Sequence, residues 1–213
     1  LLFVLVIFLS WTVFLYQGSV DPNTVLPILF GGCALAIMGF IDDRRTLPVS
    51  IRIIIQIIVT GWTLRMLGTP SSLTIGAHHV IIPLGTLFWF ISGAWMSNLY
   101  NFMAGIDGLV ATQTIVMGIF LVMVLGSTEL RLLTLSVAIA MMGFLYWNWH
   151  PAKIFMGDTG SQFLGLFLAA IGIKYFWTPI DPSIIHENIN DTKQFFISIL
   201  AFAIPIIDTT TLV

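Results

Sequence analysis

The sequence predicts an all-α integral membrane protein, a polytopic bundle of transmembrane helices that forms one domain over residues 1–213. Composition is the first reason, because 58% of the residues are hydrophobic and only 8% are charged. Such a chain has the lipid bilayer as its expected solvent. The second reason is the length of its apolar runs, since a helix needs about 20 mostly apolar residues to cross a bilayer.

Eight apolar runs separated by polar breaks predict about eight spans. Their approximate bounds are 1–16, 24–41, 52–67, 80–97, 108–126, 130–148, 160–177 and 195–213. The last run contains Pro205 and Asp208, which predict a kink or an end there. The chain starts at Leu1 and stops after an apolar run, so we expect a fragment that is truncated at both ends. His78 and His79 lie between two runs, where a short hairpin is the simplest interpretation.

Composition also excludes several classes of function. The single Cys33 rules out an internal disulfide, and no Cys or His spacing suggests zinc or an iron–sulfur cluster. A net charge of −2 with only eight Lys and Arg residues indicates no nucleic-acid surface.

Eight crossings place alternate loops on opposite sides of the membrane and so sort the acidic residues. One side receives segments 41–48, 98–108 and 147–161, and we call this end of the bundle the motif face. The carboxylates that converge there are Asp42, Asp43, Asp107, Asp158 and Asp208. Lys and Arg are divided four against four between the two sides, so the positive-inside rule does not orient the chain.

The first motif, segment 39–45, sets Asp42 beside Asp43 where the second span ends. Two adjacent carboxylates repel each other unless a cation lies between them, which makes the pair a candidate base or metal site. The alternative is a solvated helix end in which Arg44 and Arg45 neutralise the pair.

The second motif, segment 98–108, combines amides, glycines and a carboxylate. Asn98 and Asn101 are three residues apart and share a helix face, while Gly105 and Gly108 bracket Asp107. Such a segment offers polar groups and bare backbone to a ligand, although a helix-ending turn is the alternative.

The third motif, segment 153–161, precedes the seventh span. Thr159 or Ser161 can cap that helix, and its free N–H groups predict an anion site. Asp158 at the same place suits a hard cation, unless it merely caps the helix. Phosphates approach so acidic a face only if a divalent cation bridges them to the protein, and Mg²⁺ fits best. The three motifs together therefore predict phosphoryl transfer at a membrane surface.

These motifs resemble the polyprenyl-phosphate N-acetylhexosamine-1-phosphate transferase family, MraY/WecA-like enzymes also called glycosyltransferase family 4. The resemblance runs from Gly39 to Asp208, and segments 148–153 and 205–209 look nearest to the bacterial O-antigen-initiating branch. It implies a bundle of about ten or eleven helices in the bacterial inner membrane, with the site in a cytoplasmic groove. The implied substrates are a UDP-N-acetylhexosamine and undecaprenyl phosphate, and homodimers occur in the family.

The resemblance also implies roles for individual residues. Asp158 matches the magnesium ligand, with Asn101 as its partner and Mn²⁺ as an alternative ion. Asp42 and Asp43 match the paired catalytic aspartates, with the choice between general base and nucleophile left open.

The nucleotide site is implied in the same way. Phe155 matches the aromatic residue that stacks on uracil, and Asp107 matches the position that recognises the uracil edge. Asn98 matches a residue in the wall of the same nucleotide site. Gly157 and Lys153 complete the expected substrate-binding set.

One departure from the family pattern bears on activity. Most bacterial members have Asp where this chain has Ala104, although the eukaryotic dolichyl-phosphate branch also has Ala. The C-terminal loop with sugar-contacting His and Arg residues is also missing, so an inactive fragment of the family is an alternative. A different class of function is an ion-coupled transporter, which usually has mid-membrane charges and an inverted repeat, and a third class is a nonenzymatic scaffold.

Overall fold

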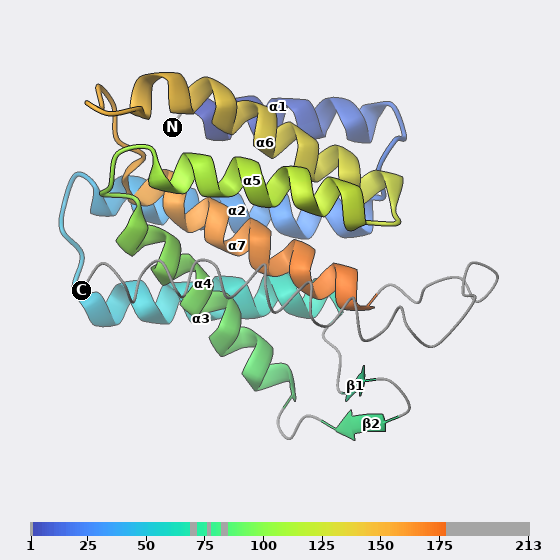
Figure 1. Ribbon diagram of the computed structural model, residues 1–213. Coiled ribbons are helices and arrows are strands. Elements are labelled where there is room, and N and C mark those ends of the chain that lie inside the picture. The colour runs from blue at the N-terminus through green and yellow to red at the C-terminus, as the bar shows by residue number, and fades with distance from the viewer. Residues whose placement is uncertain (1, 69–71, 76–77, 82–84, 178–213) are drawn as a thin grey trace.

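A computed structural model describes residues 2–68, 72–75, 78–81 and 85–177, which form seven helices and one β-hairpin (Figure 1). The helices are α1 Leu2–Tyr16, α2 Pro22–Asp42, α3 Val49–Leu67, α4 Gly85–Met103, α5 Leu109–Val124, α6 Thr128–Asn148 and α7 Gly157–Trp177. Strands β1 Ser72–Ile75 and β2 His78–Ile81 pair antiparallel, with Ser72 opposite Ile81. The helical fold class and the hairpin at His78 and His79 are therefore confirmed.

The first seven predicted spans each correspond to a helix, and the eighth, 195–213, lies outside the described residues. The fourth prediction was misplaced at both ends: residues 80 and 81 belong to β2, and α4 continues to Met103 through both asparagines. In the described part of the chain, α2, α3 and α6 are each long and apolar enough to cross a membrane, and α1 and α5 are shorter apolar helices.

Local sequence explains several helix ends. The carboxylate of Asp21 accepts a hydrogen bond from the N–H of Asn23 and caps α2, which has Pro22 in its first turn. Ser127 caps α6 in the same way by accepting from the N–H of Leu130. The right-handed helix path of α3 ends at Gly68, whose φ is +83°.

Helix α7 lies at the centre of the bundle, where it packs against α2, α4 and α3, while α5 pairs with α6 and α1 lies along α6. Its side chains are accordingly buried over most of its length, and Phe163 and Phe167 pack with Trp11 of α1. Glycines permit the closest approaches. A Cβ at Gly165 would lie 2.4 Å from the Cα of Ser97 in α4, and one at Gly39 would lie 2.4 Å from the carbonyl carbon of Asp158.

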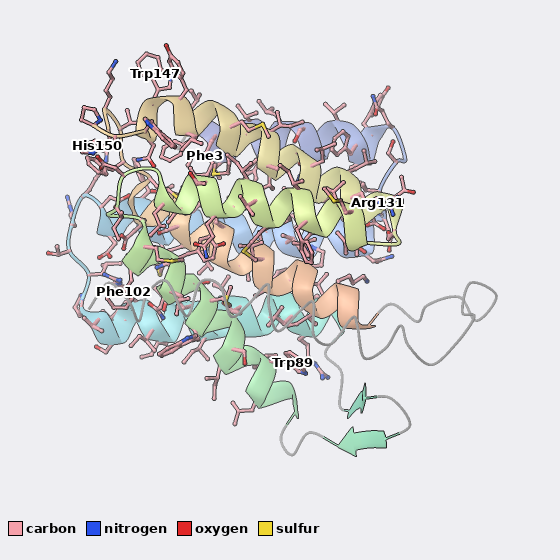
Figure 2. The ribbon with its side chains drawn as sticks, in the orientation of Figure 1. Phe3, Trp89, Phe102, Arg131, Trp147 and His150 are labelled. Carbon is pink, nitrogen blue, oxygen red and sulfur yellow. The ribbon has the colours of Figure 1, made fainter. Side chains whose placement is uncertain are left out.

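The loops at 43–48, 104–108 and 149–156 meet at one end of the bundle, the motif face, as predicted (Figure 1). Figure 2 shows Phe102, Trp147 and His150 at this end and Arg131 at the other. The sorting of loops is therefore confirmed for the described residues, whereas Asp208 lies outside them.

Candidate functional site

The carboxylate of Asp43 caps the N-terminus of α7 from outside that helix. Its Oδ1 accepts the N–H of Asp158 at 2.9 Å, and its Oδ2 accepts both the N–H (3.3 Å) and the hydroxyl (3.0 Å) of Thr159. Ser161 donates its hydroxyl to the carbonyl of Gly157. The prediction that Thr159 or Ser161 caps the helix is therefore wrong, because α7 already begins at Gly157 and both residues lie inside that helix. The anion at this helix end is Asp43 itself.

Asp42 faces a different set of partners from its neighbour. It is buried, with Oδ1 accepting the N–H of Leu47 at 2.6 Å and Oδ2 paired with the Arg52 guanidinium at 2.8 Å. The same guanidinium lies 3.7 Å from Oδ2 of Asp158, whose carboxyl group also interacts directly with that of Asp42. We call these three residues the Asp42–Arg52–Asp158 cluster. Two close carboxylates are tolerated there because a cation lies between them.

Arg52 is a site residue that the sequence interpretation missed. The sequence offers Arg44 and Arg45 as the cations that neutralise the aspartates, but the Arg44 guanidinium lies over the Phe40 ring, 4.3 Å from its centroid. Arg52 reaches the cluster from the first turn of α3. A signal was present, since an arginine at the start of the third predicted span lies at the motif face.

The two asparagines of α4 have different surroundings although they share a face. Asn101 lies against the carboxylate of Asp158, and its buried Nδ2 forms no hydrogen bond of normal geometry within the described structure. Asn98 instead exchanges hydrogen bonds with Gln56 of α3, donating from Nδ2 at 2.9 Å and accepting on Oδ1 at 3.2 Å. Its amide is thus directed into the bundle, and its contact with the nucleotide stays a prediction.

Asp107 lies in the loop between α4 and α5, where it contacts the loop of the third motif. Its Oδ2 accepts the N–H of Ala152 at 3.1 Å and lies 2.9 Å from Nδ1 of His150. The hydrogen bond from the backbone N–H of Ala152 lowers the pKa of Asp107 below its ordinary value, and the hydrogen bond with the His150 ring lowers it further by a smaller amount. The carboxylate is therefore ionised at neutral pH and presents only acceptors to a ligand.

Asn148, at the end of α6, ties these two loops together. It is buried, its Oδ1 accepts the N–H of Gly108 at 3.0 Å, and its Nδ2 donates to the carbonyl of Ile154 at 2.8 Å. One amide side chain therefore holds the second motif against the third. Its partner in the second motif, Gly108, lies 40 residues before Asn148 in the sequence.

Phe155 and Lys153 lie on the exposed part of the motif face. The Phe155 side chain is 59% exposed, at one end of an apolar groove of about 800 Å³ between α1 and α6. The Lys153 ammonium lies 5.4 Å from the ring centroid of Trp147, which is also in the groove wall. An exposed ring three residues before Asp158 in the sequence is free to stack on a ligand.

The donor set for a metal ion is sparse. No three Asp, Glu, His or Cys side chains gather into a metal cage among the described residues. Both oxygens of Asp42 already have partners, which leaves the Asp158 carboxylate with the neighbouring Asn101 amide. This set fits Mg²⁺, since that ion binds one or two carboxylates and completes its coordination with water and substrate phosphates.

Comparison with known proteins places this geometry in context. Residues 25–176, which include all three motifs, match the sequence model of glycosyl transferase family 4. The chain is 28% identical over 208 residues to a probable undecaprenyl-phosphate N-acetylglucosaminyl 1-phosphate transferase of Bacillus subtilis, which covers 92% of the chain and 54% of that protein.

Two further relatives are phospho-N-acetylmuramoyl-pentapeptide-transferases. The chain is 36% identical over 180 residues to that of Halalkalibacterium halodurans, a match that covers 74% of the chain and 54% of the relative. It is 32% identical over 179 residues to that of Bacillus subtilis, a match that covers 73% of the chain and 53% of the relative. The chain thus spans about half the length of the curated relatives it matches.

Proposed function

Because the chain belongs to glycosyl transferase family 4, we propose that its protein transfers an N-acetylhexosamine-1-phosphate from a UDP-sugar to undecaprenyl phosphate. An oxygen of the lipid phosphate forms a bond to the sugar-bearing phosphorus, and the bond from that phosphorus to UMP breaks. The products are UMP and undecaprenyl-diphosphate-sugar, the first intermediate of a cell-envelope glycan such as O-antigen or a similar polymer. The observation that carries the proposal is the Asp42–Arg52–Asp158 cluster at one end of a membrane helix bundle.

The proposed setting is the bacterial inner membrane, crossed several times, with the motif face in the cytoplasm. Nucleotide sugars are made in the cytoplasm, so a site that consumes them must open there. Three described helices have the length and apolarity of spans, and the relatives are bacterial enzymes of this kind. The polyprenyl acceptor is itself a membrane lipid, which suits a site at the end of such helices.

Asp42 and Arg52 are proposed to act on the reacting phosphates. Asp42 supplies the catalytic carboxylate, as general base toward the lipid phosphate or as nucleophile, and its two partners hold it in one orientation. The Arg52 side chain is 27% exposed, so its guanidinium can also bind a phosphate oxygen that enters the cluster. Asp43, the second predicted catalytic aspartate, contributes by holding the first turn of α7 in place.

Asp158 and Asn101 are the proposed ligands of Mg²⁺, with Mn²⁺ as a substitute. When bound, the ion would neutralise charge on the pyrophosphate oxygens of the donor. The protein's own contribution is to fix the Asp158 carboxylate, since its backbone N–H is held by Asp43 and its side chain faces Arg52.

The nucleotide is proposed to lie beside the cluster, along the loops that Asn148 ties together. Phe155 is exposed and can stack on the uracil ring, while Asp107 can accept a hydrogen bond from the uracil edge. Lys153 is on the same segment and offers a positive charge for the phosphates, and Gly157 begins α7 at the end of that segment.

The transferase reaction is tested directly with the full-length protein in detergent. Undecaprenyl phosphate, Mg²⁺ and one UDP-N-acetylhexosamine at a time, beginning with UDP-GlcNAc, are supplied, and UMP release is measured. Release of UMP with formation of the lipid-linked sugar supports the proposal. Absence of UMP with every donor, from a folded protein, contradicts it and favours an inactive member of the family.

A further inference from the structure

Three amide side chains form a hydrogen-bonded network inside the bundle, one from each of three helices. Gln56 of α3 donates its Nε2 to Oε1 of Gln162 in α7 at 2.8 Å, and it is the reciprocal partner of Asn98 in α4. Gln56 and Gln162 are both 0% exposed, although their helices are otherwise mainly apolar. We call Gln56, Asn98 and Gln162 the amide network.

The amide network lies one helical turn deeper in the bundle than the site. Residues three or four apart share a helix face, and this spacing relates each amide to a residue of the site. The three pairs are Arg52 with Gln56, Asp158 with Gln162, and Asn101 with Asn98. Both α3 and α7 begin at the motif face and α4 ends there, so all three amides lie on the inner side of their partners.

Hydrogen bonds between buried amides select one arrangement of the helices. A helix that slides by one residue moves by about 1.5 Å and turns by about 100°, which would separate the amides. Nε2 of Gln162 already has no partner in the described structure, and a shift that broke the remaining bonds would leave further buried amide groups unpaired, at a cost in free energy. Contacts between apolar side chains are less directional and tolerate small shifts more readily. The amide network therefore discriminates against other registers of α3, α4 and α7.

We propose that Gln56 and Gln162 are positioning residues of the transferase site, an inference that rests on the proposed function for its catalytic consequence. They hold α3, α4 and α7 in the register that sets Arg52, Asn101 and Asp158 against one another. Asn98 contributes to the same positioning, because its hydrogen bonds with Gln56 join α4 to α3.

The first test replaces Gln56 by Met, which has a similar size but forms no amide hydrogen bonds. Gln113→Met is the matched control, since Gln113 is also buried and neither of its side-chain polar atoms has a partner in the described structure. We expect Gln56→Met to lower kcat at least about tenfold with less than about a threefold change in KM for the UDP-sugar, and Gln113→Met to change neither. Equal effects of the two variants would overturn the proposal.

A second arm separates positioning from a general loss of stability. If Gln56 acts through Arg52, Gln56→Met should cost little further activity in protein that already carries Arg52→Met, because the two changes disable the same group. Independent, multiplying effects on kcat would contradict a role through Arg52. If Gln56→Met does not fold, Gln162→Met takes its place in this test, because it removes only the 2.8 Å hydrogen bond to Gln56. We expect the same loss of kcat from that variant.

A third arm reads the helix register without any turnover. Spin labels are placed on cysteines at Val49 of α3 and Phe102 of α4, both exposed at the motif face, in a Cys33→Ala background, and their distance distribution is measured. Gln56→Met should shift or broaden the distribution, and Gln113→Met should not. An unchanged distribution would refute the network's role in register. A changed distribution, beside an unlabelled full-length parent that transfers no sugar from any donor, would support that role while refuting the proposed function.

Discussion

Asp43 and Gly157 fit together only because residue 157 has no side chain. A Cβ at Gly157 would lie 2.7 Å from Oδ2 of Asp43, and the φ of Gly157 is +66°, a conformation that residues with a side chain rarely adopt. The glycine thereby lets the Asp43 carboxylate reach the first N–H groups of α7. The start of α7, where Asp158 lies, depends on this contact.

Gly157→Ala should therefore destabilise the protein and impair the site. The left-handed backbone alone costs about 1–2 kcal/mol for a residue with a Cβ, and the displaced Asp43 adds to that cost. Thermal unfolding in detergent and UMP release measure the two effects. Gly143→Ala in α6 is the control, because a Cβ there meets nothing within 4 Å. A Gly157→Ala protein as stable and active as the control would contradict this account of the helix start.

The helices and the motif face could be predicted because they depend on local patterns. Apolar runs of bilayer length define the spans, and alternate crossings must bring every second loop to the same side. The hydrogen-bonding partners could not be predicted in the same way. Asp42 and Asp43 are adjacent, yet successive residues near a helix end point about 100° apart. Asp42 meets Leu47 and Arg52 of α3, whereas Asp43 meets the start of α7, so the packing of α2 against both helices decides their partners.

The buried amides illustrate the same limit. Gln56 and Gln162 each interrupt an apolar run, and nothing in their own helices identifies a partner 106 residues away. Arg52 differs, since its position at the start of a span already placed it at the motif face. The sequence thus predicts which end of the bundle carries the chemistry, whereas the tertiary packing determines which groups are paired.

Asp158→Asn should abolish UMP release and leave folding almost unchanged. The Asp43 cap contacts the backbone of Asp158 rather than its side chain, so the start of α7 survives the substitution. Activity above about a tenth of the parent value, a loss below about 1.4 kcal/mol in transition-state stabilisation, would count against direct metal binding. Asp21→Asn is the control, because Asn also caps helices well and Asp21 lies at the opposite end of α2.

Phe155→Ala should raise KM for the UDP-sugar much more than it lowers kcat. A ring that stacks on uracil contributes equally to the ground state and the transition state, so its loss weakens binding without slowing the chemical step. Steady-state kinetics with varied UDP-sugar measure the two parameters. Phe102→Ala provides a comparison, since Phe102 is 80% exposed at the same end of the bundle (Figure 2). An unchanged KM for Phe155→Ala would remove Phe155 from the nucleotide site.

Ala104→Asp tests whether the chain's departure from the bacterial pattern has disabled it. Ala104 follows the last turn of α4, where its N–H donates to the carbonyls of Tyr100 and Asn101. It is three residues after Asn101, so an added carboxylate would lie on the Asn101 side, toward Asp158.

We expect Ala104→Asp to change turnover only modestly, within about threefold. The Asp42–Arg52–Asp158 cluster is already paired without that charge, and a further anion gains no new cation there. Both full-length proteins are assayed with each UDP-N-acetylhexosamine donor, undecaprenyl phosphate and Mg²⁺. In a site that truly lacked an essential carboxylate, restoring it could lower the barrier by several kcal/mol and raise turnover by orders of magnitude. An active Ala104→Asp variant beside a silent parent would therefore show that the parent is a disabled enzyme, and would leave its family membership intact.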